Sequence, residues 1–283
     1  MLNSVKKNDS GRSQLLIALA LMALLDSSSM AQTCSTNGGG VALGMNQYVL
    51  NNMWNAKSDP AGTESIDVRS PVSWSTTYNW PRVDPLACRC YPSSVLGWQF
   101  NTVTPGTGLP VRLSSNTPVI STTAFNITGS AMQDITYDCW FHSVGNPTST
   151  TKPSDEMMIW EAAYNGPGPL GSLIKRGIAI DGHTWNLYEG WNSFGWEVHS
   201  FVIDNIPSGN LSGATLNLTD FTNYLVANRY GSSKPLLGSA YFTGAEFGTE
   251  VVFGSGTFNV TNYTCTVERR SASANGSKSA SED

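Results

Sequence analysis

Between Gln32 and about Val267 the sequence consists of short β-favouring runs separated by Gly, Pro, Asn and Ser. Many short strands with turn residues between them are typical of a β-sandwich or barrel. No internal repeat and no linker divides this region, so we expect one all-β domain. The predicted strands are Tyr48–Trp54, Val72–Trp80, Trp98–Val103, Ala124–Ile127, Asp134–Phe141, Glu156–Glu161, Gly177–Ile180, His183–Glu189, Gly195–Val202, Tyr241–Val252 and Thr257–Thr266.

One segment departs from this pattern. From Leu218 to Arg229 apolar residues recur at spacings of three and four, which predicts an amphipathic helix. Either Thr219 or Asp220 could cap its N-terminus, and Tyr230-Gly231 would end it. We therefore expect a single helix packed against an otherwise all-β body.

The two ends of the chain differ in composition from the rest. Three basic residues precede the apolar segment Leu15–Leu25, and small residues follow as far as Ala31, so residues 1–31 are interpreted as a secretory signal peptide. The apolar segment is shorter than the roughly 20 residues that span a bilayer. Residues 269–283 are rich in Ser, Ala and Lys and are predicted to be disordered. An N-terminal core helix is the alternative for the first segment.

The charge of the chain argues against two classes of partner. The formal net charge is −5 at pH 7, and only 13% of the residues are charged. An acidic chain with few lysines is poorly suited to nucleic acid or to anionic membranes. We expect a secreted, extracellular protein, a monomer that acts on neutral polymers and binds neither nucleic acid nor membrane.

The cysteines, histidines and glycosylation motifs give weaker signals. Five cysteines follow the signal region, so in an oxidising compartment disulfides are expected with one cysteine left over, in a connectivity that the spacing does not fix. The histidines form no ligand spacing, and no metal site is predicted. Six Asn-x-Ser/Thr motifs are candidate glycosylation sites. The residues concerned are Cys34, Cys88, Cys90, Cys139, Cys265, His142, His183, His199, Asn126, Asn210, Asn217, Asn259, Asn262 and Asn275.

Two runs carry the carboxylates on which a function can be built. In the strand that begins at Asp155, alternation places Glu156, Met158 and Trp160 on one face, like the floor of a sugar-binding cleft. The alternative is a core strand whose first residues are solvated. In the run Glu246–Val252, alternation places Glu250 on one face with Gly248, whose missing side chain would leave room for a ligand. Two facing carboxylates are the machinery of glycoside hydrolysis.

At this point the chain resembles glycoside hydrolase family 12, the secreted endo-β-1,4-glucanases and xyloglucanases. The resemblance extends over roughly Val41 to Val267. It rests on motifs in a fixed order, of which the two glutamate motifs are the most specific. The motifs are Asn51-Asn52-Met53-Trp54, Trp74–Trp80, Tyr137-Asp138, Glu156-Met157-Met158-Ile159-Trp160, Gly166-Pro-Gly-Pro169, Trp185-Asn-Leu-Tyr188, Val198-His-Ser-Phe201, Asn223-Tyr224-Leu225, Phe247-Gly-Thr-Glu250 and Gly254-Ser-Gly-Thr257.

The resemblance implies a fold and a set of catalytic roles. The fold is a β-jelly roll of two curved antiparallel sheets with an open substrate cleft, here residues 32–268. Glu156 matches the family's nucleophile, Glu250 its acid/base, and Asp138 the aspartate that hydrogen-bonds the nucleophile. The implied reaction is hydrolysis of β-1,4-glucosidic bonds in cellulose, β-glucan or xyloglucan with retention, through a covalent glycosyl-enzyme, without metal or organic cofactor.

The resemblance also implies residues that bind the sugar chain. Trp54 matches a stacking platform, with Asn52 beside it on the same strand face. Met158 and Trp160 would line the cleft floor, and Pro169 lies in a loop that borders the cleft. For Trp54 the alternative is a core indole, and for Pro169 a simple turn.

Other acidic and aromatic residues are weighed against these. Glu246 shares the face of Glu250 but sits where the family tolerates neutral residues. Glu189 and Glu197 are expected to be solvated. For Trp191 and Trp196, cleft and surface positions are equally compatible with the sequence.

Four positions depart from the family pattern. Asp155 precedes the nucleophile, where its charge could raise the pKa of Glu156, and Glu161 replaces an aliphatic residue. Val251-Val252 replaces the usual Pro-Phe, and Cys34 lacks its usual partner near Thr63. These departures motivate a second hypothesis, a catalytically silent sugar-binding jelly roll. A xylanase of the related jelly-roll family is a third, which fits the Met-Ile-Trp strand poorly.

Overall fold

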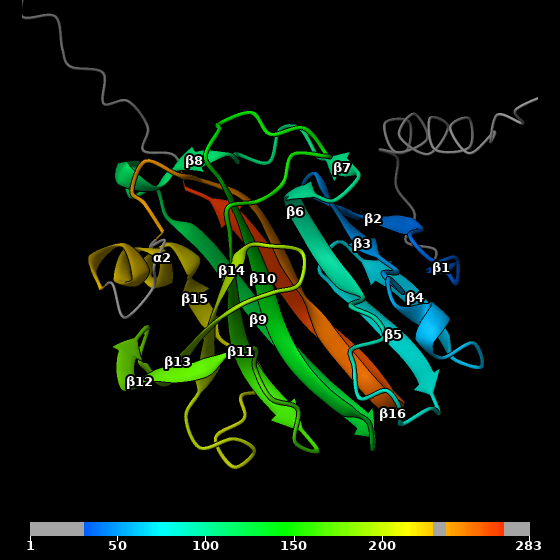
Figure 1. The fold of residues 1–283 in the computed structure, drawn as a ribbon. Coiled ribbons are helices and arrows are strands. Elements are labelled where there is room, and N and C mark those ends of the chain that lie inside the picture. Colours follow the sequence, from blue (N-terminus) through cyan, green and yellow to red (C-terminus); the bar gives the residue numbers. More distant parts are fainter. Residues whose placement is uncertain (1–30, 229–235, 269–283) are drawn as a thin grey trace, which may run out of the picture.

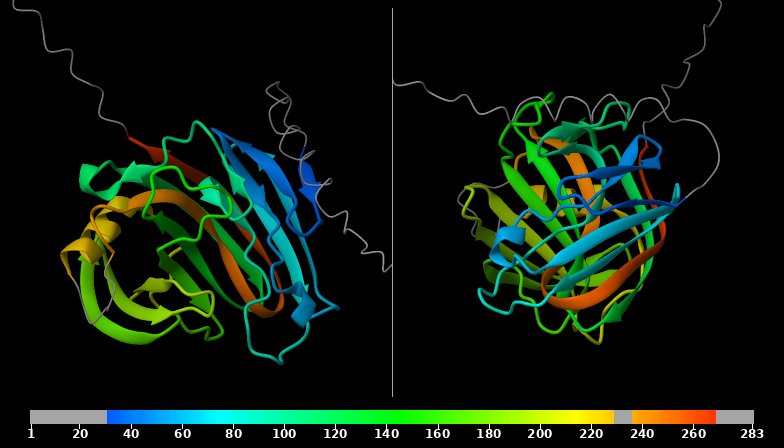
Figure 2. Two further views of the ribbon diagram at one scale, coloured as in Figure 1. Left: turned by 45° about the horizontal axis from the view of Figure 1, so that its top comes forward. Right: turned by 90° about the vertical axis from the view of Figure 1, so that its right-hand side faces the viewer.

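β-branched and aromatic residues in alternating patterns form strands throughout the computed structural model, which describes residues 31–228 and 236–268. The strands make two curved sheets that stack face to face (Figures 1 and 2). The predicted signal peptide, the tail from residue 269 and the helix end at Tyr230-Gly231 lie outside the described residues. Among the described residues, no helix is both long and apolar enough to cross a bilayer.

The larger sheet carries the strands that matter most below. Its path runs through β3, β6, the first half of β16, β10, β11, β14, β13 and β12, with β2 beside β3 and β8 beside β16. The strands are β2 (Gly40–Gly44), β3 (Gln47–Leu50), β6 (Ser93–Gln99), β8 (Val111–Arg112), β10 (Met132–His142), β11 (Asp155–Tyr164), β12 (Ser172–Ile180), β13 (His183–Trp191), β14 (Glu197–Ile203) and β16 (Tyr241–Val267).

The smaller sheet is built on the second half of β16. Its order is β1, β4, β5, β16, β9 and β15. These strands are β1 (Gln32–Cys34), β4 (Thr63–Ser70), β5 (Ser73–Trp80), β9 (Val119–Gly129) and β15 (Thr215–Asn217). The short β7 (Thr102–Val103) pairs with β6, and 3₁₀ turns occupy Ala56–Ser58 and Leu113–Ser115.

Strand β16 belongs to both sheets and passes between them at Gly254. Phe253 pairs with β10 of the larger sheet, whereas Gly254 pairs with β5 of the smaller one. The φ angle of Gly254 is +104°, and a Cβ there would lie 2.6 Å from Cα of Ala131. Only glycine accepts this turn without strain.

The expected all-β jelly-roll sandwich is confirmed, with two refinements. Strands β11 and β14 are parallel, whereas their other neighbours in the larger sheet are antiparallel. The predicted strand Tyr48–Trp54 ends at Leu50, so Asn52 and Trp54 lie beyond it and the argument that they share a strand face is wrong.

The one α-helix among the described residues, α2 (Leu218–Ala227), packs beside β13 and β14 (Figure 1). Phe221 makes edge contacts with Trp185 and Phe201. The N-cap of helix α2 is Asn217, whose side chain accepts a 3.3 Å hydrogen bond from the amide of Thr219. Neither of the two residues predicted to cap the helix, Thr219 or Asp220, does so.

Apolar side chains on the two faces of strand β11 belong to separate clusters. Met157 and Ile159 belong to the main core between the sheets. Met158 and Trp160 belong to a second cluster with Trp98, Trp140, Ala163, Trp196, Val198 and Val202. The predicted alternation along β11 is therefore correct. The face that carries the second cluster is called the outer face below.

Candidate active site

Glu156 is the second residue of β11, and its side chain lies on the outer face with those of Met158 and Trp160. Its partner across the sheet on β10 is Trp140, and its neighbour on β14 is Val198. The side chain is nearly buried, at 8% exposure, and its Oε2 accepts a 2.6 Å hydrogen bond from the indole Nε1–H of Trp196. A short hydrogen bond from a fixed indole holds the carboxylate in one orientation.

Five influences on the pKa of Glu156 act in opposite directions. Burial raises it most, and the negative charges of Glu250 and Glu246 raise it further. The hydrogen bond from Trp196 and the positive charge of His199 lower it. The charge of Glu250 on β16 therefore acts on Glu156 from two strands away.

Glu250 lies on β16 directly opposite Asp134 of β10. Burial raises its pKa, while hydrogen bonds from Cys88 and Asp134 lower it. Burial and the charge of Glu250 raise the pKa of Asp134 well above the usual carboxyl range. These effects favour the neutral form of Asp134, which hydrogen-bonds Glu250.

Gly248 does not open space for a ligand, contrary to the sequence-based expectation. A Cβ at Gly248 would lie 2.2 Å from the carbonyl oxygen of Pro92 and 2.9 Å from Cα of Ser93. The missing side chain instead lets the backbone that enters β6 approach β16.

Asp138 lies on β10 between the two glutamates, two residues from the partner of Glu156. Burial raises its pKa well above the usual range, and the charges of Glu156, Glu250, Glu246 and Asp134 raise it further. Its Oδ1 is buried and has no hydrogen-bond partner. Burial and these neighbouring charges therefore favour the neutral form of Asp138.

Glu246 is held by structural hydrogen bonds. It is 1% exposed, and its two oxygens accept from Ser93 Oγ at 2.7 Å and Trp140 Nε1 at 2.8 Å. With both oxygens engaged inside the protein, it is the least suited of these carboxyls to proton transfer.

The residues predicted to bind sugar lie in different environments. Trp54 is 50% exposed and next to Asn55, whose amide donates a 2.8 Å hydrogen bond to the carbonyl of Cys88. The carbonyl of Asn52 accepts from the amide of Tyr91 at 2.8 Å. This segment therefore lies near Cys88 and Glu250, and the exposure of Trp54 argues against a core indole.

The other three predicted sugar ligands are less exposed than Trp54. Met158 and Trp160 are 5% and 2% exposed, so they support the outer face more than they present atoms on it. Pro169 is half-buried in the loop that reaches Gly171, and that glycine lies against Gly190 of β13.

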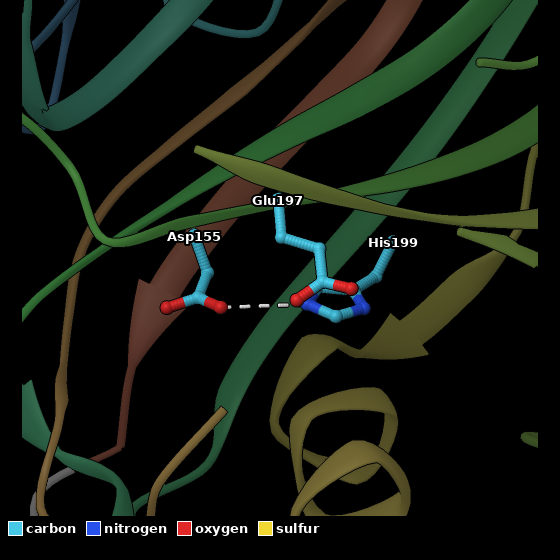
Figure 3. Close-up of side chains that lie close together, drawn as sticks. All are labelled: Asp155, Glu197 and His199. Atoms are coloured by element: carbon cyan, nitrogen blue, oxygen red, sulfur yellow. Dashed lines mark hydrogen bonds and ion pairs between the residues drawn. The ribbon is translucent and has the colours of Figure 1, made fainter. Parts of the chain in front are cut away.

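Asp155, Glu197 and His199 form a buried charged cluster (Figure 3). Alternation along β11 places Asp155, and with it this cluster, on the opposite face of the sheet from Glu156. Donor atoms of Asp155, Glu197 and His199 all lie within 4.8 Å of one another. His199 Nε2 is 3.5 Å from Asp155 and its Nδ1 is 3.0 Å from Glu189. The expectation that Glu189 and Glu197 are solvated is therefore wrong. Glu189 of β13 pairs with His199, and the buried Glu197 lies two residues before His199 on the same face of β14.

The remaining departures also have structural settings. Glu161 is fully buried and its carboxylate accepts from Thr123 Oγ1 at 2.9 and 3.1 Å. Val251 is buried and bridges to Cys90. Cys34 and the other four cysteines are all unpaired, so the expected disulfides are not confirmed.

Sequence reasoning missed three residues at this site. Trp196, which the sequence left between cleft and surface, contacts Glu156. Asp134 and Cys88 were not singled out, although both hydrogen-bond Glu250. For Asp134 the signal was available, since it shares the alternation of Asp138, but the opposing residue depends on the register between β10 and β16.

Comparison with known sequences matches residues 46–268 to the family described as glycosyl hydrolase family 12. The chain belongs to this family. As a family 12 member it is a glycoside hydrolase, and the sequence-based family prediction is confirmed.

Three relatives illustrate the range of the family. Endoglucanase S of Pectobacterium parmentieri is 32% identical over 88% of this chain and 93% of that protein. Xyloglucan-specific endo-beta-1,4-glucanase A of Emericella nidulans is 30% identical over 89% and 99%. A protein of Phytophthora nicotianae that is named an inactive glycoside hydrolase is 28% identical over 78% and 87%.

Solved structures agree with the sequence matches. The native family 12 xyloglucanase from Bacillus licheniformis superposes with a TM-score of 0.76 at 31% identity, covering 84% of this chain and 100% of that chain. The fold is thus that of a family 12 hydrolase.

Proposed function

We propose that the protein hydrolyses internal β-1,4-glucosidic bonds of cellulose, β-glucan or xyloglucan with retention of configuration. The observation that carries this proposal is the placement of Glu156 on β11 and Glu250 on β16, the two strands that flank β10, close enough for the charge of Glu250 to raise the pKa of Glu156. Endoglucanases and xyloglucanases among the relatives support the substrate class.

Glu156 is the proposed nucleophile. Its carboxylate attacks the anomeric carbon, and the bond from that carbon to the leaving oxygen breaks as the glycosyl–Glu156 ester forms. The hydrogen bond from Trp196 keeps Glu156 oriented and lowers its pKa. Protonated Asp138 beside it would donate a hydrogen bond to the carboxylate of Glu156 before the attack, and again when hydrolysis of the ester releases that carboxylate.

Glu250 is the proposed acid/base. Protonated Glu250 gives its proton to the leaving oxygen, and the resulting carboxylate then takes a proton from the water that cleaves the ester. Retention requires carboxyl groups about 5–5.5 Å apart when substrate is bound. Asp134 and Cys88 donate to Glu250 and so stabilise its charged form between the two steps.

The proposal includes the bounds of the catalytic domain, its export and its oligomeric state. We propose that residues 32–268 form one secreted catalytic domain, that residues 1–31 direct its export, and that it works as a monomer. Trp54 and Asn52 would bind the glucan on the side of Glu250, and Pro169 would border the chain on the side of β13.

A depolymerisation assay tests the proposal. Reducing ends should appear from carboxymethyl cellulose, mixed-linkage β-glucan or xyloglucan, with little release from xylan. Glu156→Gln and Glu250→Gln should each lose at least a thousandfold in activity. Glu161→Gln is the matched control, because Glu161 lies on β11 but its carboxylate is bound by Thr123 of β9 in the other sheet. NMR of the first product should show the β-anomer.

A catalytically silent glucan-binding protein is the second candidate, since one relative is named inactive. Both glutamates stand in their expected strands, which favours the enzyme. Binding of glucan with no product from the wild-type protein between pH 4 and 9 would establish the silent alternative.

A further inference from the structure

The turn between β13 and β14 is a rigid element beside Glu156. The side-chain oxygen of Asn192 accepts hydrogen bonds from the backbone amides of Phe194, Gly195 and Trp196 at 3.0, 2.9 and 3.3 Å. Two backbone hydrogen bonds also close the turn, from Asn192 to Trp196 and from Gly195 to Asn192. Such a turn needs no further ordering when a ligand arrives.

This turn presents an exposed aromatic ring next to Glu156. Phe194 is 61% exposed and stacks on Trp196 with a centroid distance of 5.6 Å and an interplanar angle of 17°. Trp196 in turn donates to Glu156 and packs edge-on against Trp140. One face of Phe194 is thus covered by the indole that holds Glu156.

A second aromatic residue of the same hairpin, Trp191, is also exposed, but it lies on the other face of the sheet. Trp191 is 48% exposed, but it follows the alternation of Glu189, whose carboxylate reaches His199 behind the outer face. Its pairing partner is Glu197, in that same cluster. Trp191 therefore lies on the opposite face from Phe194 and Trp196.

We propose that the exposed ring of Phe194 is a sugar-binding platform that stacks against a glucosyl ring of the bound glucan, beyond the ring at Glu156. Pyranose rings present flat C–H faces, and a fixed aromatic plane offers them contact area at little entropic cost. The inference rests on the proposed function, because it takes the occupant to be the glucan chain that Glu156 and Glu250 cleave.

Substitution of Phe194 tests the platform by kinetics. Phe194→Leu, which keeps apolar bulk but loses the flat ring, should raise KM for cellohexaose about three- to tenfold, the effect of losing one aromatic contact. Phe194→Tyr should restore the wild-type KM. Trp191→Leu should leave all constants unchanged. The acidic limb of the pH profile of kcat/KM should stay in place in Phe194→Leu, since the platform acts on binding.

Binding measured without turnover separates this inference from the proposed function. In the Glu250→Gln background, calorimetry should show cellohexaose binding weakened by the same factor when Phe194→Leu is added. An unchanged KM and Kd would overturn the platform even if the enzyme is active. A shifted acidic limb would also overturn it, because Phe194 would then act through Trp196 on Glu156. An inactive wild-type protein whose Kd still depends on Phe194 would sink the hydrolase and keep the platform.

Discussion

The indole nitrogen of Trp196 lies 2.6 Å from Oε2 of Glu156 and donates its hydrogen to it. Glu156 lies on β11 and Trp196 lies in the turn just before β14, and the two meet because β11 and β14 pair in parallel with Glu156 beside Val198. This hydrogen bond favours the ionised form of Glu156 against burial and against the charge of Glu250.

Replacing the indole by a ring without a donor should therefore disfavour the carboxylate. In Trp196→Phe the pKa of Glu156 should rise by about one unit, the equivalent of a hydrogen bond to a charged group. Carboxyl ¹³C titration, assigned by comparison with Glu156→Gln, measures this directly. Because less enzyme carries an ionised nucleophile, kcat/KM should fall about tenfold on the acidic side of the optimum. An unchanged pKa would show that the hydrogen bond contributes nothing.

A second prediction concerns the pair Asp134 and Glu250. Burial raises the pKa of both, and Asp134 is taken as the neutral donor. The titratable groups that face this pair are Cys88 from the loop before β6, Tyr91, Asp138 on β10 and Glu156 on β11.

Asp134→Asn keeps a neutral donor and should leave the pKa of Glu250 and the alkaline limb of kcat/KM nearly unchanged. Asp134→Leu removes the donor, so the pKa of Glu250 should rise by about one unit and the alkaline limb should move to higher pH. A fall in that pKa in Asp134→Asn would mean that Asp134 carries the charge. The pH–rate profile and the carboxyl titration together show whether Asp134 is the neutral donor or carries the charge.

A third prediction concerns stability and Glu161. Burial raises the pKa of this carboxyl to about 8, although Thr123 lowers it by donating hydrogen bonds. The folded state therefore holds its proton more tightly than the unfolded state. Stability from this group is complete below about pH 4.5 and is lost as pH rises through 8.

Glu161→Gln should consequently match the wild-type protein near pH 4.5 and exceed it at pH 8 by about 4 kcal/mol in free energy of unfolding. Denaturant melts at the two pH values measure the difference. Glu268→Gln, at an exposed carboxylate, is the control and should show no such pH dependence. An equal effect of Glu161→Gln at both values would contradict the assignment.

The buried His199 should give stability the same pH trend by a different route. Burial alone would lower the pKa of His199, but hydrogen bonds and charges of Asp155 and Glu189 raise it to about 9. Because the folded pKa lies above the unfolded value near 6.5, the stabilisation is complete below pH 6.5 and is lost as pH rises through 9.

His199→Gln leaves buried carboxylates without their cation and should cost about 3 kcal/mol at pH 6. The deficit should shrink toward pH 9, where the wild-type imidazole also loses its proton. Thermal melts at pH 6, 7.5 and 9 give the comparison. If the deficit were constant across this range, the imidazole would be neutral throughout and the lost contribution would be packing alone.

Much of the fold was predictable because its determinants are local. The period-two alternation along β11 needs only a regular strand. As predicted, Met158 and Trp160 lie on one face of the sheet, and Met157 and Ile159 lie on the other. The helix was also found, since its apolar spacing depends only on neighbouring turns. Its N-cap residue was not found, because Asn217, Thr219 and Asp220 are all residue types that cap helices. Only the backbone conformation shows that the helix begins after Asn217.

For the site, the sequence could predict individual residues and their match to a family pattern, but not the contacts between them. Sequence by itself determined which two glutamates to consider and the strands that carry them. It could not show that Gly248 accommodates Pro92 and Ser93, that Trp196 holds Glu156, or that Glu189 meets His199. Those contacts join residues from separate strands. Cross-strand register, loop closure and the dielectric around a buried charge decide them, and these exist only once the chain has packed.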